Sequence, residues 1–504
     1  MINQILNPAR KNAILIILIG LYILTLIAVS TNINDAYLWF DEAGQFWISK
    51  GLNHDSAPLQ ETKELSVTIE NNANYNMDPG GFSILLHFWT GISNSTNWLR
   101  LLPFIFFIGT IFSFIYISYL WTKNINIALF LGFLPFLFGN VVAMGFEVRG
   151  YSMEYFGVIF AIIAVESLKA KITLVRLYFF GCILSVFLTS RYSILVVIFV
   201  VSLYVIYLIS KSVMGFWLKI LSLFLYALPL FVSITTVYFH ALRIQNPGIE
   251  QLDYQGYLIN NWTLLFWPFR NFIYLVILFF LILLLAISIK NKYSVIKKYQ
   301  ALLSTSVTIN LLFIVISFLG KYMWVPFLKW GLPYFITVLL CLVALLGEML
   351  VRIIKRPSIF KYTFLLVVLI LSLYINKDSV LARTYQAEIF ERYPPLLSCM
   401  NDIDFAKYNK IYVDWWASPS IRYLFEYGAL KQSRSGNYPE KFTFGTGGLH
   451  TAPYIPWHDF LLTQPRMNSL LQYDLMITPE IVNWGESDQW VLIDGCEEGV
   501  YIKK

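Results

Sequence analysis

The sequence has little charge and little cysteine. Only 13% of its 504 residues are Asp, Glu, Lys or Arg, about half of the share that is usual in globular proteins. Four cysteines in a chain of this length exclude a small secreted domain built on disulfide bonds. Instead, 58% of the residues are hydrophobic and 17% are aromatic. This composition excludes a soluble enzyme and a disordered chain, and it predicts an integral membrane protein.

Long apolar runs predict a polytopic α-helical membrane protein with about eleven transmembrane helices. A spanning helix needs roughly 20 mostly apolar residues. The polar breaks between neighbouring apolar runs are weak at 144–150 and at Arg191, so nine to twelve spans fit the sequence. The eleven runs lie near 12–30, 99–120, 126–143, 151–168, 174–190, 193–210, 217–239, 271–289, 300–319, 328–350 and 362–376. They define a membrane domain over residues 1–376.

Basic residues are divided unevenly between alternate loops. With the N-terminus inside, sixteen Lys and Arg residues fall on the inner side, and nine fall in the longer outer loops before residue 377. The positive-inside rule therefore predicts an inside N-terminus, and an odd number of spans then places residues 377–504 outside. The acids agree, with eight in 31–80 and sixteen in 377–504. The net charge of +7 thus reflects a basic inner rim rather than a nucleic-acid partner.

Two outside segments have a different pattern. The first loop, 31–98, contains semi-apolar pieces at 37–52 and 79–92 that are too short to span and predict interfacial helices, with a polar mobile loop between them. Residues 377–504 predict a small α/β domain. Its expected elements are strands at 411–413 and 490–493, and helices at 382–393 and 418–429. Cys399 and Cys496 lie in this domain, where they either form a disulfide or are unrelated small residues, whereas Cys182 and Cys341 lie in spans.

Three carboxylates in the first outside loop are candidates for chemistry. Asp41 and Glu42 follow the first span, and Asp78 begins the second interfacial piece. Carboxylates that converge in a cleft act as general bases or bind a divalent cation such as Mg²⁺ or Mn²⁺. Asp41 and Asp78 are equally typical of helix N-caps, a role that leaves Glu42 unexplained.

Basic and aromatic residues lie on the same side. Arg149 and Tyr151 stand at the outer entrance to the fourth span, where a guanidinium and a helix N-terminus suit a phosphate. Singly such residues are common interface anchors, but together they predict a positive wall for an outside cavity. The further members of this wall are Arg191, Arg243 and Lys321. His54 is a candidate ligand near the acids, although the histidines show no metal-ligand spacing.

Taken in order, several segments resemble the GT-C glycosyltransferases, notably the protein O-mannosyltransferases and the lipid A aminoarabinose transferase. The resemblance covers residues 30–210 best. One departure is the glycine pair after Asp78-Pro79, where relatives often carry Pro-Pro or another acid. The matching segments are Phe40-Asp41-Glu42-Ala43, Asp78-Pro79-Gly80-Gly81, Asn97-Trp98-Leu99-Arg100-Leu101-Leu102-Pro103 and Val148-Arg149-Gly150-Tyr151-Ser152, with Tyr412-Val413-Asp414 and Pro419-Ser420-Ile421-Arg422-Tyr423 in the outside domain.

The resemblance implies transfer of a sugar from a polyprenyl-phosphate carrier to an acceptor outside the cytoplasmic membrane, with inversion at the anomeric carbon. Asp41 is then the base, and Glu42 orients the acceptor, holds a divalent ion or supports Asp41. Asp78 and His54 lie on the acceptor side. The residues that then bind the donor phosphate are Arg149, Tyr151, Arg191, Arg243 and Lys321. In scale the chain resembles prophage-type enzymes that add glucose from undecaprenyl-phosphate-glucose to lipid-linked O-antigen of lipopolysaccharide. That likeness implies an inner-membrane enzyme whose C-terminal domain is periplasmic.

Three other functions fit a polytopic envelope protein. An O-antigen polymerase or ligase typically has its large loop in mid-chain, rather than an acidic first loop and a C-terminal domain. A transporter of lipid-linked sugars is expected to line its pathway with intramembrane charges, whereas here charges lie at span ends. A non-catalytic protein that binds glycan through its outside domain is the third.

Overall fold

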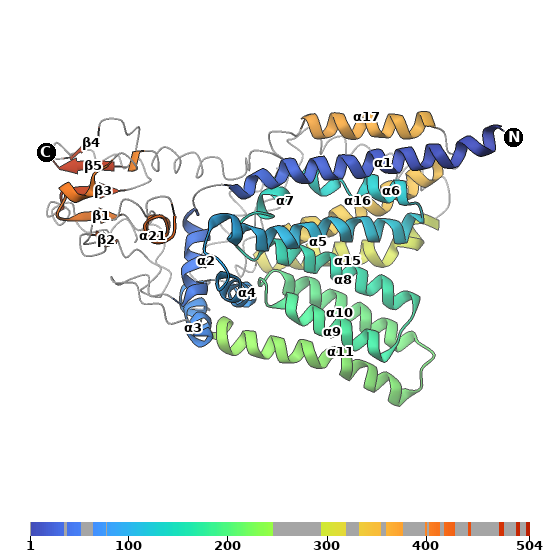
Figure 1. Cartoon of the computed structure of the whole chain (residues 1–504). Coiled ribbons are helices and arrows are strands. Elements are labelled where there is room, and N and C mark those ends of the chain that lie inside the picture. The colour runs from blue at the N-terminus through green and yellow to red at the C-terminus, as the bar shows by residue number, and fades with distance from the viewer. Residues whose placement is uncertain are drawn as a thin grey trace.

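A computed structural model describes the larger part of the chain. The described residues are 2–34, 38–51, 64–76, 78–244, 294–318, 332–353, 359–375, 399–400, 403–413, 418–428, 442–444, 473–477, 490–493 and 500–503. Within them the fold consists of a helical bundle, three short helices across one end of the bundle, and a small sheet beyond those helices (Figure 1).

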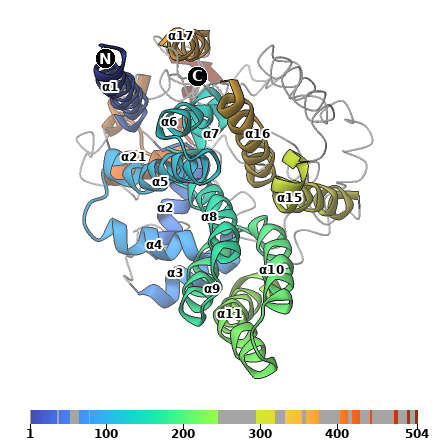
Figure 2. The same ribbon diagram turned by 90° about the vertical axis from the view of Figure 1, so that its right-hand side faces the viewer.

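The protein is a polytopic helical membrane protein. Six described helices are long and apolar enough to cross a membrane: α1 (Ile2–Ser30), α5 (Thr96–Thr122), α8 (Tyr151–Ala170), α10 (Ile194–Lys211), α11 (Phe216–Val237) and α16 (Leu332–Ile353). Three further helices with shorter apolar cores accompany them: α9 (Leu174–Leu188), α15 (Ser294–Phe318) and α17 (Ile359–Ile375). The expected run at 271–289 lies outside the described residues. Seen along its axis, the bundle has α8 among α5, α9, α10 and α16, all of which it contacts (Figure 2).

One expected span is not a continuous helix. The run 126–143 forms α6 (Ile125–Leu131), η2 (Leu134–Leu137) and α7 (Gly139–Met144). Pro135, the second residue of η2, has no N–H to donate to the preceding turn. At the first break, a Cβ on Gly132 would lie 2.4 Å from both Ile115 Cγ1 and Tyr22 Oη. Glycine therefore allows α1 and α5 to approach this break closely.

The segment between the first two long helices, 31–98, contains one helix more than expected. Helices are confirmed in both predicted segments, 37–52 and 79–92, as α2 (Phe40–Lys50) and α4 (Gly81–Thr90). The prediction of a mobile loop between them is wrong for residues Leu65–Tyr75, which form helix α3. The buried side chains of this segment follow helical spacing but are mostly polar: Thr68 and Asn72 in the helix and Asn76 at its C-cap, with Ala73 as a small apolar residue. Apolar periodicity therefore does not reveal the helix.

The C-terminal residues form a five-stranded sheet. Its strands are β1 (Ile411–Val413), β2 (Phe442–Phe444), β3 (Leu475–Ile477), β4 (Trp490–Leu492) and β5 (Val500–Lys503), in the order β2-β1-β3-β5-β4. Strand β1 is parallel to β2 and β3, whereas β5 is antiparallel to β3 and β4. Helix α21 (Ser418–Glu426) packs with the sheet residues. The strands expected at 411–413 and 490–493, and the helix expected in 418–429, are confirmed. The expected helix at 382–393 lies outside the described residues.

The sheet and helix α2 share apolar contacts. Trp39 and Phe40, just before and at the start of α2, are buried in the core that the sheet forms with α21. The N-terminal end of α1 lies at the opposite end of the bundle from the sheet (Figure 1). Cys399 is disulfide-bonded, whereas Cys182 and Cys341 are free. Cys496 is not among the described residues.

Candidate functional site

Helix α2 separates two neighbouring carboxylates. Consecutive residues of an α-helix point about 100° apart, since there are 3.6 residues per turn. The Asp41 side chain is 21% exposed, whereas the Glu42 side chain is fully buried. The two acids therefore face different surroundings, although both lie in the first turn of α2.

Glu42 is bound by at least three groups among the described residues. Its Oε2 accepts a hydrogen bond from the backbone N–H of Trp39 at 3.3 Å, the half of a capping box that the third residue of a helix supplies. The same oxygen lies 2.9 Å from Nη2 of Arg100, a fully buried guanidinium near the start of α5. Its Oε1 accepts from the backbone N–H of Val148 at 3.1 Å.

Asp41 belongs to a cluster of four charged side chains, which we call the carboxylate–arginine cluster. Its members are Asp41, Asp78, Arg149 and Arg191. Arg149 Nη1 lies 3.5 Å from Asp41 Oδ2, and its Nη2 lies 3.4 Å from Asp78 Oδ2. Arg191 Nε lies 3.4 Å from the other oxygen of Asp78. The two arginines and two acids thus alternate along one chain of contacts.

Behind the cluster, Arg191 reaches into the bundle. Its Nε lies 3.7 Å from Oε2 of Glu154, a buried acid one turn into α8. The other oxygen of Glu154 accepts a hydrogen bond from the Ser193 hydroxyl. The Arg191 guanidinium lies 4.0 Å from the Tyr151 ring centroid, and that of Arg149 lies 5.9 Å from it. Both distances are within the range of cation–π attraction, so the Tyr151 ring contributes to holding both arginines.

Glycines allow three turns to meet at the cluster. Gly80 has φ +100°, which favours glycine, and the N–H of Gly81 donates to Thr189 O at 2.9 Å. A Cβ on Gly81 would lie 1.9 Å from Thr189 Oγ1, and one on Gly150 would lie 2.9 Å from Ser190 O. The glycine pair after Asp78 therefore brings that acid against the turn that carries Arg191.

A buried amide network supports the Asp78 turn. Asn72 of α3 donates to the Asp78 carbonyl at 2.8 Å and accepts from Ser83 of α4 at 2.6 Å. Gln45 of α2 donates to Ser83 Oγ at 2.7 Å and accepts from Asn76 at 3.1 Å. The polar faces of the three short helices thus bind one another, which fixes Asp78 relative to α2.

The electrostatics of the cluster keep Arg149 charged. Burial alone would lower its pKa, but Asp41, Tyr151 and Asp78 together raise the pKa of Arg149 above its usual value. Two guanidinium groups beside the N-terminus of α8, whose N-cap is Gly150 and has no side-chain oxygen, suit a phosphate. A partly exposed carboxylate, Asp41, in contact with one of them, Arg149, suits proton abstraction.

The structure brings together Asp41, Asp78, Arg149, Tyr151 and Arg191, five of the residues that the sequence selects. Arg243 is exposed at the end of η3 (Tyr238–Leu242) and takes no part in the ion pairs of the cluster. Lys321 and His54 lie outside the described residues. Sequence reasoning missed Arg100 and Glu154 as members of the site. The available signal was a charged residue beside or within an apolar run, which is costly unless it is paired.

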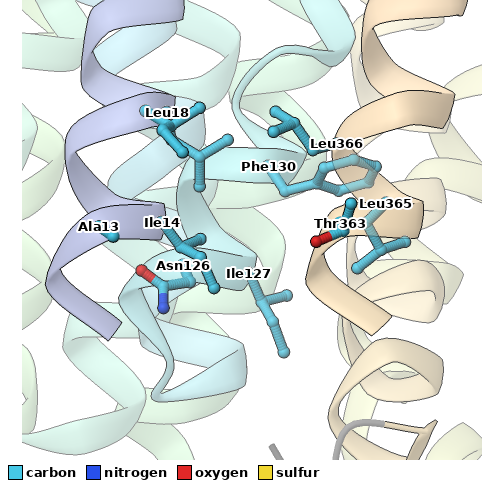
Figure 3. Close-up of a pocket in the computed structure, with 10 residues that line it drawn as sticks. Ala13, Ile14, Leu18, Asn126, Ile127, Phe130, Thr363, Leu365 and Leu366 are labelled. Carbon is cyan, nitrogen blue, oxygen red and sulfur yellow. The ribbon is translucent and has the colours of Figure 1, made fainter. Parts of the chain in front are cut away.

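The described residues do not fit a divalent cation. The space between the Asp41 and Asp78 carboxylates is taken by the Arg149 guanidinium, and Glu42 is turned toward Arg100. Among the described residues, no three His, Cys, Asp or Glu side chains gather as a metal site would require. A cavity of about 130 Å³ lies elsewhere, between α1, α6 and α17, and its lining is mostly apolar (Figure 3).

Comparison with protein families and with curated proteins adds nothing to the interpretation of this geometry. No protein-family model matches the chain, and no curated protein matches it either.

Proposed function

We propose that the protein is an inverting glycosyltransferase that moves a sugar from a polyprenyl-phosphate carrier to an acceptor hydroxyl. The observation that carries the proposal is the contact between a partly exposed carboxylate, Asp41, and a guanidinium, Arg149, at 3.5 Å. The base and the phosphate-binding group thus lie in one cluster, where a donor phosphate that replaces Asp41 on Arg149 would bring the anomeric carbon next to the base.

In the proposed reaction Asp41 takes the proton of the acceptor hydroxyl. The hydroxyl oxygen forms a bond to the anomeric carbon, while the bond from that carbon to the phosphate oxygen breaks. The polyprenyl phosphate leaves with the electron pair, and its negative charge is bound by Arg149 and Arg191. The attack opposite to the leaving group inverts the anomeric centre.

The finer assignments belong to the same proposal. We propose a GT-C-like bundle of about eleven spans in a bacterial inner membrane, with a cytoplasmic N-terminus, residues 377–504 forming a periplasmic α/β domain, and the cluster on the periplasmic side. The placement of the sheet and the N-terminal end of α1 at opposite ends of the bundle supports this topology (Figure 1). The proposed donor is undecaprenyl-phosphate-glucose, and the proposed acceptor is lipid-linked O-antigen.

Purified protein with undecaprenyl-phosphate-glucose and lipid-linked O-antigen tests the proposal. We expect one hexose to be added to the acceptor. Asp41→Asn should lower kcat by about 10²–10⁴-fold, the usual contribution of a general base. Arg149→Gln should raise KM for the donor. The matched control is Glu64→Gln, an exposed carboxylate of the same outside loop that precedes α3.

Each alternative has its own outcome in this assay. Transfer by Asp41→Asn at the wild-type rate would contradict the role of the base. Lengthening of the glycan by whole repeat units would identify a polymerase or ligase. Movement of the intact lipid-linked sugar across proteoliposomes, without transfer, would identify a transporter.

A further inference from the structure

The buried ion pair of Glu42 and Arg100 has no access to a substrate. Both side chains are fully buried, and their charged atoms lie 2.9 Å apart. Charges removed from water in this way are retained only where they are paired and hydrogen-bonded. The pair therefore acts on the site through the structure that it holds, not through contact with reacting atoms.

We infer that Arg100 and Glu42 are positioning residues that set the distance between Asp41 and Arg149. This inference rests on the proposed function. Glu42 is the neighbour of Asp41 in α2, so fixing its side chain fixes the first turn of that helix. Its hydrogen bond to the Val148 N–H reaches the residue directly before Arg149. One carboxylate thus connects the segment that carries the base to the segment that carries the phosphate-binding guanidinium.

Arg100 attaches this connection to the helical bundle. It lies one turn into α5, a 27-residue helix that packs against α8 in the bundle. Glu42 Oε2 accepts from both the Trp39 N–H and Arg100, so the start of α2 is tied to α5. The turn before α8 is tied to the same carboxylate, since the N–H of Val148 donates to Oε1.

The inference predicts that breaking the pair affects both halves of the site. Glu42→Gln leaves a buried guanidinium without its counter-charge, and Arg100→Gln leaves a buried carboxylate. Each single variant should therefore lower kcat and raise donor KM by at least tenfold each. The double variant Glu42→Gln/Arg100→Gln has no unpaired charge, and its amides can bind each other and the Val148 N–H. It should regain at least tenfold in kcat/KM over either single variant.

A cross-linking measurement reports the distance without requiring sugar transfer. Asp41→Cys/Arg149→Cys, made with Cys182→Ser and Cys341→Ser, is treated with a short bifunctional methanethiosulfonate. Adding Glu42→Gln should lower the cross-linking yield severalfold, and adding Arg100→Gln as well should restore it. If the proposed glycosyltransferase reaction is absent from the wild type, this measurement still decides the positioning role.

The matched control is an ion pair at the other end of the bundle. Glu348 of α16 binds Lys298 at 2.8 Å and Arg352 at 3.2 Å, and Lys298 also donates to the carbonyl of Trp121 near the end of α5. Glu348→Gln should lower the unfolding temperature without changing kcat, KM or the cross-linking yield. Two results would overturn the inference: a folded double variant as impaired as the single variants, or Glu42→Gln with unchanged kinetics and cross-linking.

Discussion

Asp41 and Glu42 are adjacent in sequence, but their side chains have opposite surroundings. The sequence identifies the acidic pair after the first span because charged residues stand out against apolar runs. It does not identify which acid is buried, since the answer depends on Arg100, which is 58 residues away from Glu42. The same is true of Glu154, whose partners Arg191 and Ser193 come from another turn of the chain.

At this scale the Asp41–Arg149 contact predicts competition with the donor. A lipid phosphate must replace Asp41 on Arg149 Nη1, so removal of the Asp41 charge should strengthen phosphate binding even though transfer stops. We expect Asp41→Asn to bind undecaprenyl phosphate about two- to fivefold more tightly, the equivalent of roughly 0.5–1 kcal/mol for a partly exposed ion pair. Equilibrium binding in detergent micelles measures this change.

The control for this prediction separates direct pairing from general charge. Glu64→Gln removes one exposed negative charge from the same outside loop without touching Arg149, so its affinity for undecaprenyl phosphate should equal that of the wild type. In an Arg149→Gln background the gain from Asp41→Asn should disappear. A gain of equal size in that background would show that Asp41 and the phosphate do not compete for Arg149.

At the scale of elements, apolar runs were sufficient to predict most helices, because each run carries its own signal. Helix α3 escaped prediction because most buried side chains at 68–76 are amides and hydroxyls, which bind α2 and the turn before α4. The broken run at 126–143 escaped because hydropathy does not register Pro135 or the close approach at Gly132. Meeting points between turns are equally invisible in sequence, although the glycine pair after Asp78 marks one of them.

The meeting of the Asp78 turn with Thr189 gives a prediction about Gly81. A Cβ at this position would overlap Thr189 Oγ1 and lie 2.7 Å from its carbonyl oxygen, so Gly81→Ala must push the Asp78 turn away from Arg191. We expect a loss of about 1–3 kcal/mol in the free energy of unfolding, as for overpacked sites. Donor KM should rise as well. Thermal unfolding and steady-state kinetics measure the two effects.

Gly44 provides the matched control on the neighbouring helix. A Cβ there would meet no atom within 4 Å, and the residue lies inside α2. Gly44→Ala should therefore leave donor KM unchanged and stabilise the protein by up to about 1 kcal/mol through helix propensity. If Gly81→Ala and Gly44→Ala behave alike, the close approach at Thr189 does not position Asp78.

At the scale of the whole molecule, the sheet and the bundle meet through α2. Trp47 Nε1 donates to Pro419 O at 2.9 Å, and the Tyr423 hydroxyl donates to Asn94 O at 2.6 Å. The Phe46 ring packs edge-on against Tyr423, with 5.1 Å between the ring centroids. Because Trp39 and Phe40 are also buried in the core of the sheet, the helix that carries Asp41 is held from both sides.

This arrangement predicts which ends of the molecule are reachable from outside the cell membrane. Lys503 is exposed on β5 in the sheet, and Lys171 is exposed just after α8, at the end of that helix away from the cluster. In a Cys182→Ser/Cys341→Ser background, Lys503→Cys should react with a membrane-impermeant maleimide in intact spheroplasts. Lys171→Cys should react only after lysis, because a basic residue at this end belongs to the inner rim.

The two positions test the topology as a pair, because each serves as the control for the other. Labelling of both before lysis would mean leaky spheroplasts, which the unsubstituted background and a cytoplasmic marker detect. Labelling of Lys171→Cys alone would invert the molecule and place the carboxylate–arginine cluster on the cytoplasmic side. The cluster would then have to bind its lipid-phosphate donor and its acceptor on the cytoplasmic side. That result would contradict both the proposed topology and the proposed transfer to a periplasmic glycan.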